Sequence, residues 1–282
     1  MSINMEEPMR FTVGCRLRYQ VKAPIAFVFN VAVADSACQE ITEEKLQTDP
    51  DLAVEQVKLV AGSRHMRLHA PVGEFTLHYR ASGTRAPVQV STAGLAEVSP
   101  AKLPLDIVHY VYPSRYCPSD RLLNFAAREF AAVQPGYVRV QAICDWIHAN
   151  VEYAFGASDA HTAANDTLLG RRGVCRDFAH LGIALCRALN IPARFVTGYA
   201  QGLQPPDFHA CFEAYLGQRW FLFDPTKLIP LDSIVRIGTG RDAADASFAT
   251  IFGSAQMTEM NVFYHETVQE TESDGHTALS TC

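Results

Sequence analysis

Three side-chain types that together can perform covalent catalysis occur in order along the second half of the chain. Cys175 follows a tight glycine turn in the segment Gly173–His180, and His209 and Asp224 follow near the ends of a predicted strand pair. A thiol nucleophile, an imidazole base and a carboxylate that orients the base are the side chains of cysteine-dependent acyl transfer. We therefore predict these roles for Cys175, His209 and Asp224.

The apolar pattern that follows Cys175 predicts a buried helix over residues 175–189. Asn190 and Pro192 predict its end, because asparagine tolerates left-handed backbone and proline cannot continue the helix. Cys175 then lies in the first turn, where unpaired N–H groups and the helix dipole favour a thiolate. Its backbone N–H is a predicted donor to an oxyanion. A lone cysteine is more often a small buried apolar residue, but the glycine turn and the two partners favour the nucleophile.

The positions of His209 and Asp224 depend on a predicted hairpin. Residues 208–216 and 219–224 each have the pattern of a strand, and Gly217–Gln218 is a plausible two-residue turn. Pairing from this turn places His209 on the same sheet face as Asp224, one diagonal step of roughly 7–8 Å away. A turn one residue longer or shorter would place them on opposite faces.

The second oxyanion donor cannot be assigned from the sequence. The candidates are three residues that precede the nucleophile: Trp146, Tyr153 and Asn165. Each is more often a structural residue than a catalytic one.

In these motifs the chain resembles bacterial members of the transglutaminase-like superfamily, in the papain-like group often labelled cysteine proteases. The resemblance rests on the segments Gly173–His180, Cys186–Tyr199, His209–Tyr215 and Trp220–Thr226, with further similarity at Tyr112–Cys117, Ser119–Asp120 and Gly240–Asp245. It covers most of the chain, including a β-rich N-terminal domain typical of the subfamily. The one small departure is Asn190, where a glycine is usual.

The resemblance implies Cys175 as nucleophile, His209 as base and Asp224 as its orienting group, with a thioester intermediate and no cofactor. Water as acceptor would make the protein a protease or amidase, which we favour; an amine acceptor would make it a transglutaminase. A non-catalytic binding module that keeps the fold is an alternative. A zinc site of Cys, His and Asp is another, although no fourth ligand is evident. We identify no acidic loop for calcium.

Composition limits the class of protein. Of 282 residues, 48% are hydrophobic and 19% are charged, and the net charge is −6, which is typical of a soluble globular protein. We find no basic stripe, no long apolar run and no signal region in the first ten residues, so we expect neither nucleic acid nor membrane as a partner. Eight cysteines without paired spacing predict reduced thiols and a cytoplasmic location. The expected partner is a protein or peptide substrate, and homo-oligomer formation stays open.

The pattern along the chain predicts an α+β protein with two domains and a tail. Residues 1–100 are predicted as a β-sandwich-like domain and linker, with short strands up to Gly83 and a linker from Thr84 to Leu105. Residues 101–268 are predicted as a papain-like or transglutaminase-like core, with helices over 119–132 and 137–150, the nucleophile helix, strands over 193–200, 208–216 and 219–224, and a further strand over 258–266. Residues 269–282 are predicted as a disordered tail.

Overall fold

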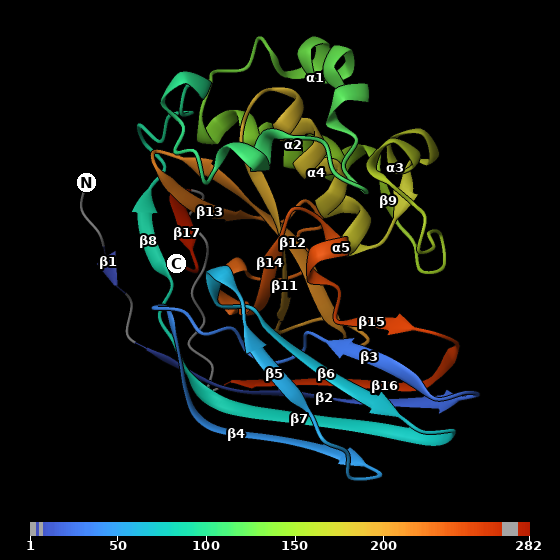
Figure 1. The fold of residues 1–282 in the computed structure, drawn as a ribbon. Helices are drawn as coiled ribbons and strands as arrows, with labels where there is room; N and C mark the ends of the chain where they lie inside the picture. Colours follow the sequence, from blue (N-terminus) through green and yellow to red (C-terminus); the bar gives the residue numbers. More distant parts are fainter. Residues whose placement is uncertain (1–3, 6–7, 267–275) are drawn as a thin grey trace.

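The computed structural model describes residues 4–5, 8–266 and 276–282. Figure 1 shows the helices gathered at one end of the molecule and two β-sheets at the other, with a further sheet between them. The fold is mixed α and β with antiparallel sheets, as predicted.

The N-terminal part is a sandwich of two four-stranded antiparallel sheets, with orders β16-β2-β7-β4 and β15-β3-β6-β5. Their strands are β2 (Met9–Val21), β3 (Ile25–Phe29), β4 (Gln39–Asp49), β5 (Glu55–Lys58), β6 (Arg64–Ala70), β7 (Gly73–Arg85), β15 (Ala249–Phe252) and β16 (Ala255–Glu266). Alternate residues of β2 are buried, from Phe11 to Val21, and they share one apolar core with Phe27 and Leu77. The alternation therefore directs one face of each sheet inward.

Two of these sandwich strands come from the far end of the chain. β15 pairs with β3, and β16 pairs with β2 over almost its whole length. The predicted strand over 258–266 exists within β16, but it completes the N-terminal sandwich. The predicted domain ranges 1–100 and 101–268 therefore do not follow the sheets, because the chain returns to its first domain.

A sheet of four antiparallel strands, in the order β13-β12-β11-β14, forms the middle of the core. Its strands are β11 (Ala193–Tyr199), β12 (Phe208–Leu216), β13 (Arg219–Phe223) and β14 (Val235–Gly240). Leu216 pairs with Arg219, and Glu213 pairs with Leu222, so the predicted register of the hairpin is confirmed. Gly217 and Gln218 both have positive φ, 53° and 70°, as a two-residue turn of type I′ requires.

The described residues also form five helices and five short 3-10 turns. The helices are α1 (Leu123–Phe130), α2 (Tyr137–Asn150), α3 (Ala164–Gly170), α4 (Cys175–Ala188) and α5 (Ala243–Ala246), and the 3-10 turns are η1 (Val60–Gly62), η2 (Pro100–Lys102), η3 (Val108–Val111), η4 (Ser119–Arg121) and η5 (Leu231–Ser233). α4 is buried on nearly every side and packs on β12. A Cβ on Gly182 would lie 2.6 Å from the ring of Phe212, so the glycine lets helix and sheet approach closely.

The prediction of a disordered tail is wrong for its last residues. β17 (Thr277–Ser280) pairs with β8 (Val88–Ser91), and β8 also pairs with β1 (Asn4–Met5). β8 lies inside the stretch predicted as a linker. The part of the predicted tail from 269 to 275 lies outside the described residues.

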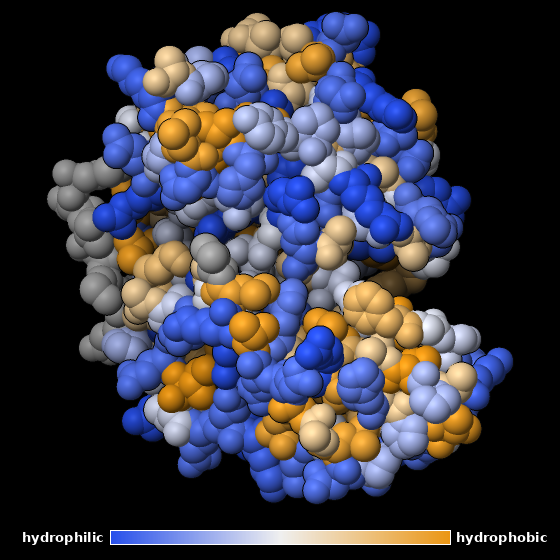
Figure 2. Space-filling view, viewed as in Figure 1, coloured by the Kyte–Doolittle hydropathy of each residue, from blue (hydrophilic) through white to orange (hydrophobic). Residues whose placement is uncertain are grey.

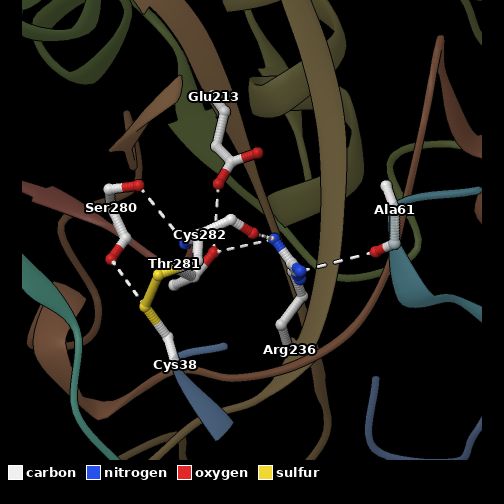
Figure 3. The surroundings of a disulfide bond; sticks show 7 residues. All are labelled: Cys38, Ala61, Glu213, Arg236, Ser280, Thr281 and Cys282. Atoms are coloured by element: carbon white, nitrogen blue, oxygen red, sulfur yellow. Dashed lines mark hydrogen bonds between the residues drawn. A yellow bond between two sulfur atoms is a disulfide. The ribbon is translucent and has the colours of Figure 1, made fainter. Parts of the chain in front are cut away.

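The prediction of eight reduced thiols is also wrong, because Cys38 and Cys282 form a disulfide. Figure 3 shows the segment that it fixes: Thr281 and Cys282 lie beside the buried guanidinium of Arg236 and the carboxylate of Glu213. The two cysteines are 244 positions apart, so no local spacing could have indicated the pair. The disulfide attaches the end of the chain to the segment just before β4.

Candidate active site

The turn before α4 is built by a glycine and an aspartate. The Oδ2 atom of Asp177 accepts the N–H of Val174 at 2.9 Å, and Arg176 forms an ion pair with the same carboxylate at 3.0 Å. A Cβ on Gly173 would lie 2.9 Å from Oδ2 of Asp177, so glycine leaves room for this cap. Asp177 therefore stabilises the start of the helix, as its position in the first turn indicates, and Cys175 becomes the first residue of α4.

Two short parallel strands place Tyr153 next to Cys175. β9 (Glu152–Tyr153) pairs with β10 (Arg172–Gly173), and Tyr153 lies opposite Gly173. Burial and the neighbouring Cys175 thiol raise the pKa of the Tyr153 hydroxyl. Hydrogen bonding with the thiol adds to this rise, whereas hydrogen bonding with the backbone of Cys175 opposes it. The phenol therefore lies at the predicted nucleophile.

His209 and Asp224 form the predicted hydrogen bond. His209 Nε2 lies 2.8 Å from Asp224 Oδ2, and both side chains are buried. Thr226 holds the carboxylate from the other side, since its hydroxyl donates at 2.8 Å and its backbone N–H donates at 2.9 Å. Thr226 was not selected in the sequence analysis as a functional residue. The sequence does contain an indication of this role: Thr226 places a hydroxyl two residues after the aspartate that ends a strand, a spacing that favours a turn closed by a hydrogen bond to the aspartate.

The other ring nitrogen of His209 has no such partner. Nδ1 is buried and makes no hydrogen bond of ordinary geometry with any described residue. Burial alone would lower the pKa of His209, but the Asp224 carboxylate and Cys175 outweigh it and raise the pKa to about 10. The imidazolium is therefore the favoured form at neutral pH, with Cys175 as its neighbour.

Cys175 differs from the other free thiols in its exposure. Cys175 is half-buried, whereas the remaining five free cysteines are buried. Burial raises the pKa of Cys15 and of Cys117 to about 12, and raises those of the other three as well. Cys175 is thus the one free thiol that a reagent or substrate can reach without local unfolding.

The three candidates for a second oxyanion donor have different surroundings. Trp146 packs between Phe125 and Phe130 and lies under the guanidinium of Arg171. Asn165 donates to Asp166 and lines a different pocket, beside Arg115 and Asp120. Among the described contacts of these three residues, only those of Tyr153 include Cys175.

A pocket of about 200 Å³ adjoins the site. Its walls include Tyr153 and His209, which both neighbour Cys175, and the loop from Gly202 to Asp207. Viewed as in Figure 1, the surface is indented between the helical part of the molecule and the sandwich (Figure 2). A substrate held in the pocket would contact Tyr153 and His209.

No group of three or more His, Cys, Asp or Glu side chains among the described residues is arranged to hold a metal ion. None of the described helices is long and apolar enough to cross a membrane.

Comparison with known families matches both halves of the chain. The profile of the transglutaminase-like superfamily matches residues 124–225, which include Cys175, His209 and Asp224. The profile of the bacterial transglutaminase N-terminal domain matches residues 9–104.

One solved structure is similar over the whole chain: "a Putative Cysteine Protease from Cytophaga hutchinsonii", with 43% identity, a TM-score of 0.95 and 99% coverage of both chains. An uncharacterized protein of Mycobacterium leprae is 28% identical over 160 residues, which are 53% of this chain and 57% of that protein. An uncharacterized protein of Mycobacterium tuberculosis is 32% identical over 143 residues, 45% of each chain. The chain thus spans about half the length of these curated relatives.

Proposed function

Because the chain belongs to the transglutaminase-like superfamily, we propose that it is a cysteine-dependent acyl-transfer enzyme that hydrolyses amide bonds. Membership supports cysteine-dependent acyl transfer in general. The observation that supports a Cys-His-Asp triad is the buried His209–Asp224 hydrogen bond, with the open Nδ1 of His209 beside an accessible thiol at a helix start.

The proposed reaction has two steps. The thiolate of Cys175 attacks the amide carbon and forms an S–C bond, while the C–N bond breaks and the leaving amine takes a proton from His209. Water then attacks the thioester and gives its proton to His209, and Cys175 leaves as a thiolate. Asp224 holds the imidazole in one orientation through both steps, and Thr226 holds Asp224.

Negative charge on the substrate oxygen needs hydrogen-bond donors. The backbone N–H of Cys175 is one proposed donor, since it lies in the first turn of α4, where backbone N–H groups lack partners within the helix. The Tyr153 hydroxyl is the second, because it lies at Cys175 and its raised pKa keeps it protonated. Trp146 and Asn165 remain sequence predictions, for which no described contact gives support.

The test is a burst experiment with p-nitrophenyl acetate, an activated acyl donor. We expect one equivalent of p-nitrophenol per protein in a rapid phase, and an acetyl group on Cys175 in the peptide mass spectrum. Cys175→Ala should show neither while keeping the circular dichroism of the wild type. An acetyl group on another residue, or a burst that survives Cys175→Ala, would contradict the proposal.

The partner, the acyl acceptor and the lack of a cofactor were predicted from the sequence, and they remain proposals. The partner is a protein or peptide, the acceptor is water rather than an amine, and the acyl transfer needs no cofactor. The same experiment separates the two alternatives. A transglutaminase would transfer most of the acetyl group to an added amine rather than to water, and a non-catalytic binding module would give no burst. The cytoplasmic location also stays a prediction, and the Cys38–Cys282 disulfide weighs against it, since disulfides persist mainly in oxidising compartments.

A further inference from the structure

The pocket beside His209 contains one acidic side chain, that of Asp207. The rest of its lining is largely apolar or aromatic, and includes Tyr153, Phe155, Leu203 and Leu228. Phe155 is 66% exposed and Leu228 is 44% exposed, although both are large apolar side chains. Exposed apolar groups around a pocket are available to a ligand.

Asp207 has capacity for a further partner. Its Oδ1 accepts the backbone N–H of Phe208 at 2.7 Å, and the described residues supply no Lys or Arg as an ion-pair partner. Burial raises the pKa of this carboxyl, and the Phe208 N–H and the neighbouring His209 offset this rise only in part. A cation bound at Asp207 would offset the cost of burying its charge.

The shape and chemistry of the pocket fit an alkylammonium group. Its apolar walls can pack against methylene groups, and its aromatic rings, Tyr153 and Phe155, can face a positive charge. The carboxylate of Asp207 can accept hydrogen bonds from the ammonium. A neutral aliphatic group would fill the same walls but would leave the carboxylate unpaired.

The position of the pocket indicates which part of a substrate it would hold. His209 lines the pocket, and in the proposed reaction His209 gives its proton to the leaving amine. The leaving amine, or an amine that enters in the reverse direction, must therefore lie on the His209 side of the acyl carbon. The pocket lies on the amine side of the bond that is broken or formed.

On the basis of the proposed acyl transfer, we infer that this pocket binds a positively charged group carried by the amine component, and that Asp207 determines this specificity. In hydrolysis the charge belongs to the leaving amine, such as a basic residue that follows the scissile amide. In aminolysis it belongs to an entering diamine. In aminolysis the free amine nitrogen bonds to the acyl carbon, the C–S bond of the thioester breaks, and the amine proton passes to His209.

The test compares amines as acceptors of the acetyl group from Cys175. The protein is acetylated with p-nitrophenyl acetate in the presence of a diamine, from diaminopropane to diaminohexane, or of the n-alkylamine of equal chain length. The N-acetyl product and acetate are then quantified. For at least one chain length we expect the diamine to react about tenfold better than its monoamine, since the second ammonium reaches Asp207.

Asp207→Asn should reduce this preference to nearly one, because Asn keeps an acceptor for the Phe208 N–H but has no charge. The two amines are compared within each variant, so a change in the rate of its p-nitrophenol burst does not affect the preference. Asp120→Asn is the matched control, since Asp120 is a carboxylate in the pocket away from the triad, and it should keep the full preference.

An unchanged preference in Asp207→Asn, or no preference at any chain length in a wild-type protein with an intact burst, would overturn the inference. Absence of the wild-type burst would contradict the proposed function instead. The comparison of diamine with monoamine on the wild-type protein needs no substitution. The inference can therefore still be tested if the Asp207→Asn protein folds poorly.

Discussion

Strand β12 holds two buried polar groups, and they differ in how completely they are bonded. Near its start, His209 bonds Asp224 through Nε2 and leaves Nδ1 without a hydrogen bond of ordinary geometry among the described residues. Four residues later, Glu213 uses both oxygens: Oε2 accepts from Arg194 at 2.6 Å, and Oε1 accepts from the Thr281 hydroxyl at 3.0 Å. The two groups share a strand and a face, yet only His209 retains bonding capacity.

The comparison shows that burial of a charged group does not by itself mark a reactive site. Both groups are excluded from water, but only His209 combines an open nitrogen, an accessible thiol nearby and an adjoining pocket. Glu213 belongs instead to a network that includes Arg236 and the end of the chain fixed by the disulfide. We therefore propose a chemical role for His209 and a structural role for Glu213.

The largest expected effect is the loss of activity when the His209–Asp224 pair is changed. Asp224→Asn should lower the rate of acetyl transfer by about 10³–10⁴-fold, because the amide no longer fixes or stabilises the charged imidazole. The free energy of unfolding should fall far less than the activity. Stopped-flow measurement of the burst and urea unfolding would provide the two values; a variant with near-normal burst kinetics would remove Asp224 from the triad.

At Glu213 we expect the opposite outcome, a loss of stability with little loss of activity. Glu213→Gln should lower the free energy of unfolding by about 3–5 kcal/mol, because the buried Arg194 loses its partner. The rate of acetyl transfer by the folded fraction should stay within about twofold of the wild type. Loss of activity without loss of stability would break the distinction between the two ends of β12.

Removal of the disulfide tests the network of Glu213 and Arg236 without changing either side chain. The double variant Cys38→Ser, Cys282→Ser should lower the free energy of unfolding by about 2–5 kcal/mol, because the unfolded chain is no longer cross-linked. Urea unfolding of the oxidised wild type beside this variant measures the difference. The burst at Cys175 should be the same in both, and a lost burst would show that the chain end supports the site.

Over a single pH unit, the smallest expected effect is the pH dependence of stability that comes from His209. Its pKa is about 10 in the folded protein and about 6.5 in an unfolded chain. A raised pKa contributes stability that is fully present below pH 6.5 and is lost as the pH rises to 10. The free energy of unfolding should fall by up to about 1.4 kcal/mol per pH unit in that window.

This slope should be shallower in His209→Asn than in the wild type, as measured by urea unfolding at several pH values. Equal slopes in the two proteins would show that the His209–Asp224 pair stays uncharged.

Local patterns were sufficient to predict much of the site. The helix over 137–150, the strand over 208–216 and the 217–218 turn are confirmed, because each is encoded within a short stretch. Since side chains in a strand alternate between faces, this register also placed His209 beside Asp224. The cap formed by Asp177 was also predictable, because it joins residues only three positions apart.

Contacts between distant parts of the chain were not predictable. The return of β16 to β2, the pairing of β17 with β8 and the Cys38–Cys282 disulfide all join residues that no local spacing relates. Asp207 was also missed, because its role depends on a pocket formed with β9 and with the chain after β13. A sequence pattern shows which face a residue occupies, but not which distant segment completes its surroundings.

The most direct test of the account is the alkylation of cysteines by iodoacetamide at mildly acidic pH, read by peptide mass spectrometry on wild type and His209→Ala. An unperturbed thiol is mostly protonated there and reacts slowly. We predict that Cys175 is labelled well before the other five free cysteines, and that His209→Ala slows it. If Cys175 reacts no faster than they do, or is unaffected by the loss of His209, no thiolate–imidazolium pair exists and the proposed chemistry is wrong.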